Sequence, residues 1–238
     1  MLLFRAGVSL ALMFGATPAW CGDVPLPPPR PAFEAAPVAG PVPRLSDPTP
    51  ATAETPKSAG VADAACERVR AGGHLEATPV APVAGAGGCG IAEPVLLKAV
   101  MLADGTRVPL QPPALMRCDL AEVLGEWMRD DVALLALAAG GGLAKVLDAD
   151  AYACRGRNQV AGARLSEHGR GNAFDFTGVV LRDGRTLTVG AGSAAMAAWR
   201  ATACARFTTV LGPGSDGFHE SHLHVDLEAR RHGGRICQ

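Results

Sequence analysis

The sequence predicts an α+β domain in which a small, mostly antiparallel sheet carries flanking helices and is cross-linked by disulfide bonds. Three observations lead there. Short strand-like and helical segments are mixed, with little of the strand–helix–strand alternation that builds parallel sheets. Asp-Gly pairs at 104–105 and 183–184 sit between strand-like runs, a hairpin signal. The chain also contains seven cysteines and a leader typical of exported proteins.

The composition of the chain excludes several classes of protein. The chain has 238 residues, enough for one domain of ordinary size and an appendage. Hydrophobic residues make up 48%, so a core can be buried and a wholly disordered chain is excluded. The formal net charge of −1 argues against a nucleic-acid binder or a basic membrane-surface protein.

Residues 1–19 have the form of a secretory signal peptide. Arg5 precedes an apolar run over 6–16, which is too short to span a bilayer comfortably, and small residues follow at 17–19. An uncleaved anchor or a buried N-terminal helix is the alternative. We therefore expect a periplasmic or secreted protein with no membrane span after the leader is removed.

Residues 20–60 are rich in proline and alanine, as in the run Pro25-Leu26-Pro27-Pro28-Pro29. This composition cannot bury a core and favours extended conformations, so we predict a disordered linker. The folded domain is predicted to span 61–238 and to act as a monomer.

The first elements of the domain follow from turn residues and periodicity. Asp63 is the predicted N-cap of a helix that runs to Arg70. Strands at 95–100 and 106–110 flank the first Asp-Gly pair, and the two prolines at 112–113 are expected to end extended structure.

Residues 114–138 have helical periodicity, with apolar side chains on one face and charged ones on the other. Three glycines at 140–142 end this helix. The remaining predicted elements are strands at 145–153, 173–181, 186–189, 207–211 and 221–228, and an alanine-rich helix at 193–205.

Six of the seven cysteines lie in the folded part, because Cys21 falls in the linker. No Cys-x-x-Cys pair is present, so a zinc knuckle or a thioredoxin-type site is disfavoured. An even number in an exported domain predicts up to three disulfides, and buried free thiols are the alternative. Cys237 would tie the C-terminal tail to the body.

Three histidines lie close together near the C-terminus. In a strand over 221–228, alternation puts His222, His224 and Asp226 on one face and Leu223, Val225 and Leu227 on the other. His219 can lean over the polar face from the incoming loop. Imidazole is a good zinc ligand, so we favour a metal site over a solvated strand face.

A second polar stretch pairs a histidine with an acid. His168 and Asp175 are seven residues apart, and Gly169 and Gly171 between them allow a sharp turn. Asp175 opens an apolar strand, where a carboxylate needs either an arginine or a metal as partner. With one histidine of the C-terminal group, these residues form a three-ligand zinc set with an open fourth position, the pattern of catalytic zinc.

The residues that carry this site resemble a known motif. The pattern Ser166-x-His168-x-x-Gly171-x-Ala173-x-Asp175, followed by His222-x-His224, resembles the zinc signature of the D-alanyl-D-alanine carboxypeptidase and murein endopeptidase superfamily, which includes the Hedgehog domain. The runs at 154–158, 164–168 with 171–173, 210–216 and 236–238 resemble the bacterial extensin-like C-terminal domain family, over about 85–238.

The resemblance implies a Hedgehog- and DD-peptidase-like fold in which His168, Asp175 and His224 bind zinc. It places His222 beside the metal, where it would polarise the substrate or the transition state. A base is also required. The spacing His219-x-x-His222-x-His224 is more like the penicillin-insensitive endopeptidase branch, which implies His219, with Glu220 as the alternative.

Three arginines precede the motif, namely Arg155, Arg157 and Arg164. Two interpretations of these arginines remain open. They can bind the carboxylates of a wall peptide, for which the guanidinium is well shaped. Equally, they can be surface charge or structural partners of Asp175 or Glu167. Ser166 is expected to hydrogen-bond the motif turn, because no nucleophile elbow is present.

These features predict an exported zinc-dependent peptidase-like protein that acts on peptidoglycan stem peptides or cross-links, with a zinc-activated water as nucleophile. The alternative is a non-catalytic, zinc-stabilised module that binds the cell wall. A base beside the metal separates the two, and His219 with His222 supplies a candidate.

Overall fold

The computed structural model describes residues 59–160, 162–190 and 192–238. The predicted signal peptide, the linker up to residue 58 and Cys21 lie outside the described residues.

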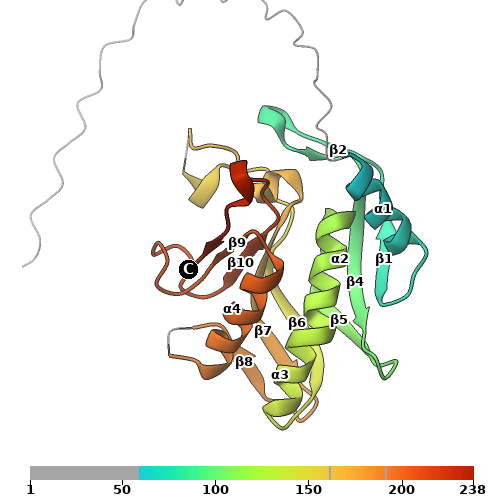
Figure 1. Ribbon diagram of the computed structural model, residues 1–238, viewed down its shortest axis with the longest axis vertical. Helices are drawn as coiled ribbons and strands as arrows, with labels where there is room; N and C mark the ends of the chain where they lie inside the picture. Colours follow the sequence, from blue (N-terminus) through green and yellow to red (C-terminus); the bar gives the residue numbers. More distant parts are fainter. Residues whose placement is uncertain (1–58, 161, 191) are drawn as a thin grey trace, which may run out of the picture. The chain divides into compact units, whose positions relative to one another are not determined.

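A nine-stranded sheet dominates the described part of the chain (Figure 1). Its strands lie in the order β1-β4-β5-β6-β7-β10-β9-β11, with β8 added beside β7. Only the β5–β6 and β9–β11 pairs are parallel. The mostly antiparallel α+β class is thus confirmed, although the sheet is larger than the small one expected. The strands are β1 (Leu75–Pro79), β4 (Pro94–Met101), β5 (Arg107–Arg117), β6 (Leu143–Asp150), β7 (Ala173–Leu181), β8 (Thr186–Thr188), β9 (Thr209–Leu211), β10 (Leu223–Asp226) and β11 (Ile236–Cys237), and a separate hairpin pairs β2 (Val83–Ala84) with β3 (Gly90–Ile91).

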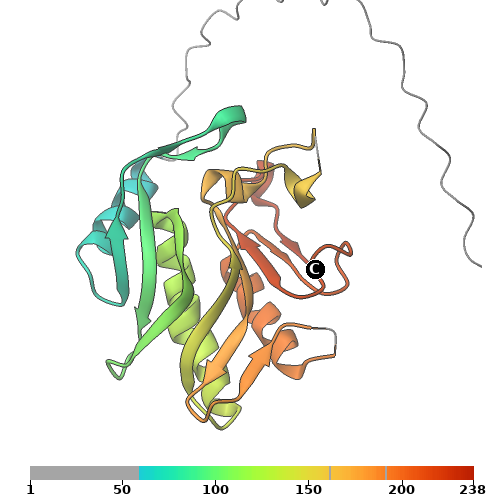
Figure 2. The same ribbon diagram turned by 180° about the vertical axis from the view of Figure 1, so that it is seen from behind.

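The helices lie together on one face of this sheet, as the front and back views show (Figures 1 and 2). They are α1 (Ala59–Arg70), α2 (Cys118–Trp127), a π-helical turn η2 (Met128–Val132), α3 (Ala133–Ala138) and α4 (Ala194–Arg206). Short 3-10 turns are η1 (Ala86–Gly88), η3 (Arg157–Gln159), η4 (Glu167–Arg170) and η5 (Arg231–Gly233). Among the described residues, no helix has the length and apolar character needed to cross a bilayer.

Two predicted boundaries are wrong. Asp63 lies inside α1, because the helix already begins at Ala59 and alanine is the strongest helix former. The prolines at 112–113 do not end extended structure: β5 continues to Arg117 and α2 begins only at Cys118. These prolines fall where the β4–β5 register shifts, a place where a missing backbone N–H is tolerated.

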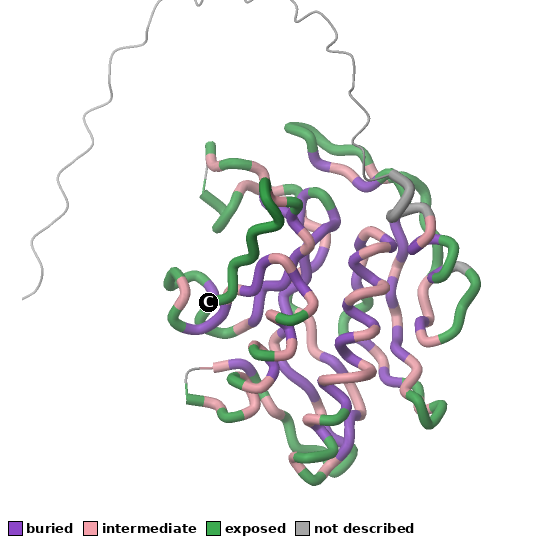
Figure 3. The backbone as a smooth tube through the Cα atoms, viewed as in Figure 1, coloured by how far each residue is buried: buried purple, intermediate pink, exposed green. Residues whose placement is uncertain are grey.

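Four aromatic rings form the centre of the core between the helices and the sheet. Phe176 of β7 packs edge-on against Trp127 and Trp199, with ring centroids 5.1 and 5.0 Å apart, and Phe207 packs against Trp127 at 5.7 Å. Figure 3 shows buried residues along β7 and β10 and exposed ones at the hairpin turns. Side chains alternate along a strand, so Asp175 points to the face without helices.

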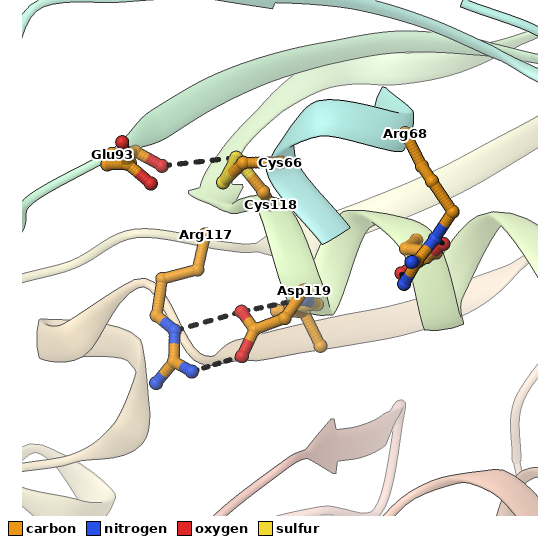
Figure 4. The surroundings of a disulfide bond; sticks show 8 residues. Cys66, Arg68, Glu93, Arg117, Cys118 and Asp119 are labelled. Atoms are coloured by element: carbon orange, nitrogen blue, oxygen red, sulfur yellow. Dashed lines mark hydrogen bonds and ion pairs between the residues drawn. A yellow bond between two sulfur atoms is a disulfide. The ribbon is translucent and has the colours of Figure 1, made fainter. Parts of the chain in front are cut away.

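All six cysteines of the folded part are paired, as predicted. Cys66–Cys118 joins α1 to the start of α2 (Figure 4). Beside this bond Arg117 forms an ion pair with Asp119, whose Oδ1 accepts from the Leu120 N–H in the first turn of α2. The other bonds are Cys89–Cys154 and Cys204–Cys237, and the latter ties the tail to α4 as expected.

We expect Asp148→Asn to stabilise the metal-free protein at pH 8. Asp148 lies on β6, and its shielded Oδ1 has no hydrogen-bond partner among the described residues. Burial, opposed by a hydrogen bond from the Asp150 backbone and reinforced by the negative charge of Asp175, raises the pKa of Asp148 to about 7.

The sign of the effect follows from linkage. The folded state binds more protons than the unfolded chain between about pH 4 and pH 7, so the free energy of unfolding falls as pH rises through that window. Thermal melts at pH 8 should show a gain of order 1–3 kcal/mol in the variant, vanishing near pH 4. An equal gain at both pH values would contradict this.

Candidate metal centre

Strand register brings the acid and one histidine together. In the antiparallel pair of β7 and β10, His224 lies directly opposite Asp175, and Leu223 lies opposite Phe176. Leu223 and Phe176 point into the core, so alternation directs His224 and Asp175 to the face without helices.

The turn before β7 brings His168 to the same place. Ser166 caps the 3-10 turn η4, and its hydroxyl oxygen accepts a hydrogen bond from the His168 backbone N–H at 3.4 Å. The turn ends at Gly171, whose φ of 62° and contact with Ile91 leave no room for a Cβ. Ser166 therefore shapes the motif turn in the way the sequence suggested.

Three ligand atoms converge. His168 Nε2 lies 3.1 Å from His224 Nδ1 and 3.2 Å from Asp175 Oδ1, and His224 Nδ1 lies 3.0 Å from Asp175 Oδ1. All three residues are buried, and together they form a group that can hold a metal ion. Zinc–nitrogen bonds of about 2.0–2.1 Å in a tetrahedron put neighbouring ligands about 3.3 Å apart, close to these separations.

The far side of each imidazole fixes its tautomer. His168 Nδ1 lies 2.5 Å from the Ala151 carbonyl oxygen, and His224 Nε2 lies 3.2 Å from Asp226 Oδ2. Both partners only accept, so both outer nitrogens carry the proton and both inner nitrogens present lone pairs. Two lone pairs and a carboxylate facing one another require a cation or a proton between them, which is the chemistry of a divalent metal site.

Without a metal, the close contacts within the trio shift the pKa values of Asp175 and His224. Burial disfavours the carboxylate form of Asp175, but hydrogen bonds and charge from His168 and His224 prevail and hold its pKa well below the ordinary range. Burial also disfavours imidazolium at His224, yet Asp175 and Asp226 raise the pKa of His224 to about 9. A proton thus takes the place of the cation.

The other predicted catalytic residues differ in how they lie relative to the trio. His222 Nε2 lies 3.6 Å from Asp175 Oδ2, and burial lowers the pKa of His222, which favours a neutral ring beside the trio. The ring of His219 lies 5.5 Å from that of His224, centroid to centroid, and its Nδ1 lies 2.7 Å from Asp216 Oδ1. Glu220 points elsewhere, because its carboxylate accepts from the Gly214 N–H at 3.0 Å.

The three arginines have carboxylate partners within the chain. Arg155 donates to Asp150 at 2.8 Å and lies 3.8 Å from Asp175 Oδ2. Arg157 and Arg164 lie 2.7 and 3.1 Å from Glu228 Oε1. Of the structural partners named beforehand, Asp175 is therefore close to Arg155, whereas Glu228 was not foreseen.

The trio opens onto a cavity of about 380 Å³. Its lining includes residues that no sequence pattern singled out. Asp150, Phe218, Arg230 and Ile236 come from separate segments whose proximity depends on the tertiary fold, and Phe218 is 58% exposed at the wall. Asp216 and Asp226 carried a signal, because their spacings to His219 and His224 place them on the same turn or face.

Fold and site define a disulfide-linked α+β domain with a buried two-histidine, one-aspartate group that can bind a metal ion. A family model described as extensin-like protein C-terminus matches residues 64–238. The chain belongs to this family, as the motif resemblance predicted. Searches among curated proteins and among solved structures found no match.

Proposed function

We propose that this protein is an exported zinc-dependent peptidase that cleaves amide bonds in peptidoglycan stem peptides or cross-links. The observation that carries the proposal is the convergence of His168 Nε2, Asp175 Oδ1 and His224 Nδ1 within 3.2 Å of one another, with both histidine lone pairs directed inward. Two nitrogens and one oxygen suit zinc, and three protein ligands leave one position for a reactant.

Zinc held by this trio would supply Lewis-acid chemistry and would lower the pKa of a water molecule to about 7. The residues around it supply the proton transfers. His219 faces the cavity and is oriented by Asp216, the arrangement of a histidine base held by a carboxylate. It would take the proton of the attacking water and return it to the leaving amine.

We assign His222 the role of stabilising the negative charge that develops on the substrate oxygen. Its ring lies at the cavity wall beside Asp175, and an N–H there can donate to the oxygen that becomes negative as the amide is attacked. A neutral imidazole carries only one N–H group, so the proposal requires that the ring of His222 direct this N–H toward the substrate oxygen. Arg155, held between Asp150 and Asp175, keeps the ligand carboxylate in place.

Peptidoglycan as substrate is proposed from the motif's resemblance to murein peptidases and from the leader that predicts export. The cavity agrees with a peptide ligand, because it joins polar groups to the apolar side chains of Phe218, Leu211 and Ile236. A periplasmic or secreted location would put the enzyme beside this substrate and would preserve the three disulfides.

The test is incubation of zinc-loaded protein with purified muropeptides at pH 5–8, followed by mass analysis of the products. Cleavage adds one water per broken amide, so new fragments should appear whose masses sum to the substrate plus 18 Da, an increment set by water alone. Intact muropeptides over the whole range, with zinc bound, would instead assign the domain as a wall-binding module.

A further inference from the structure

A second hollow adjoins the metal cavity and is strongly basic. It measures about 390 Å³ and is lined by four arginines and one glutamate, at 157, 164, 230, 231 and 228, with Ala229 and Ile236. Arg157, Glu228, Arg230 and Ile236 also line the metal cavity, so the two spaces share a wall. A formal surplus of three positive charges collects here in a chain whose formal net charge is −1.

Glu228 organises this cluster. It is 7% exposed, and its two oxygens meet three guanidinium groups: Arg157 at 2.7 Å and Arg164 at 3.1 Å on Oε1, and Arg230 at 2.6 Å on Oε2. Arg230 also donates to the Thr208 carbonyl and the Thr209 hydroxyl, which fix it in the wall. One carboxylate cannot satisfy the ten guanidinium N–H donors of Arg157 and Arg164 together, so donors remain for a ligand.

The two outer arginines can turn toward such a ligand. The side chains of Arg157 and Arg164 are 43% and 66% exposed, and ion pairs this open contribute little to stability and exchange partners readily. A ligand carboxylate would be bound by two N–H donors from one planar guanidinium, the strongest form of carboxylate recognition by arginine.

The basic cluster is tied to the metal centre through Asp226. One oxygen of Asp226 accepts from His224 Nε2, and the other accepts from the Glu228 backbone N–H at 2.9 Å. Glu228 lies four positions after His224, which limits the distance between their Cα atoms to about 13 Å. This is the reach of a peptide of a few residues.

We propose that Arg157, Arg164 and Arg230 form a carboxylate-binding subsite that holds the anionic end of the substrate while its amide lies at the metal. The proposal rests on the proposed peptidase function and specifies its substrate class: a peptide that carries a free carboxylate within a few residues of the bond that is cut. Arg155 is not part of this subsite, because Asp150 and Asp175 occupy it.

The subsite is tested by measuring ligand binding, which does not depend on catalysis. Zinc-loaded protein is titrated by NMR with N-acetyl-D-alanine, which has one carboxylate, and with N-acetyl-D-alaninamide, which has none. The acid is expected to bind at least about tenfold more tightly. The double variant Arg157→Gln with Arg164→Gln should lose this preference. Arg182→Gln is the matched control, because Arg182 is 48% exposed, pairs with Asp104 and lies outside both cavities.

Two further arms keep the result decisive. Arg164→Gln alone, at the most exposed position, should weaken binding of the acid severalfold even where the double variant does not fold. Inorganic phosphate is titrated in parallel, and binding as tight as that of the acid would assign a phosphate site and overturn the carboxylate assignment. Equal binding of acid and amide overturns it as well.

The outcome is separable from that of the peptidase proposal. Absence of acid selectivity in a protein that cleaves muropeptides would overturn the subsite alone. Acid selectivity in a zinc-loaded protein that cleaves nothing would overturn the peptidase function and leave the subsite as a binding site for wall peptides.

Discussion

Replacing His168 or Asp175 with alanine is expected to abolish zinc binding, and hydrolysis of muropeptides with it. Each change leaves two protein ligands where a catalytic zinc needs three. Loss of Asp175 also leaves two neutral imidazole nitrogens 3.1 Å apart with no negative charge between them. Elemental analysis after gel filtration should give about one zinc per wild-type molecule and almost none in either variant.

His232→Ala provides the control for this loss. His232 is exposed in η5 and lines neither cavity, so this variant should keep its zinc. Circular dichroism distinguishes a lost ligand from a lost fold. Wild-type protein that contains no zinc after dialysis against micromolar zinc would contradict the metal assignment and the peptidase mechanism together.

Replacing His219 with alanine is expected to lower kcat by roughly 10²–10⁴-fold while zinc content stays at the wild-type level. His219 has no part in the metal trio, and its contacts are with Asp216 and the neighbouring rings. Asp216→Asn should also lower kcat, because the asparagine stabilises the protonated ring less well and its amide N–H can hold the ring in the wrong tautomer. Steady-state kinetics on a defined muropeptide, with zinc measured on the same samples, check both.

Glu220→Gln discriminates between the two candidate bases. The carboxylate of Glu220 accepts from the Gly214 N–H and is exposed, so its loss should affect loop 212–220 more than the proton transfer. A larger fall in kcat from Glu220→Gln than from His219→Ala would move the role of base to Glu220.

Local periodicity was sufficient to predict much of the site. Alternation along 221–228 placed His222 and His224 on one face and the apolar residues on the other. The structure has this alternation over a shorter strand, Leu223–Asp226, and His222 precedes the strand with its ring beside Asp175. The glycines after His168 correctly indicated a tight turn that returns to Asp175. These features depend on neighbours in the chain, which a sequence displays directly.

Contacts between distant segments were beyond sequence reasoning. The proline pair at 112–113 lies in β5 because the β4–β5 pairing shifts register there, and no local pattern in the sequence marks such an irregularity. The Ala151 carbonyl that orients His168 belongs to a residue with no polar side chain, so no pattern marks it. Glu228 meets Arg157 from 71 positions away, a pairing that propensity and spacing do not encode.

The two histidines of the trio differ in how robustly their rings are held in place. His168 is oriented by a main-chain oxygen, which every amino acid at 151 would supply, so substitutions there leave the interaction in place while the bend after β6 keeps its path. His224 relies on the side chain of Asp226, which also reaches Thr209 and the backbone of Glu228. Substitution of Asp226 is therefore expected to disturb the orientation of His224 although it changes none of the three residues that could hold a metal ion.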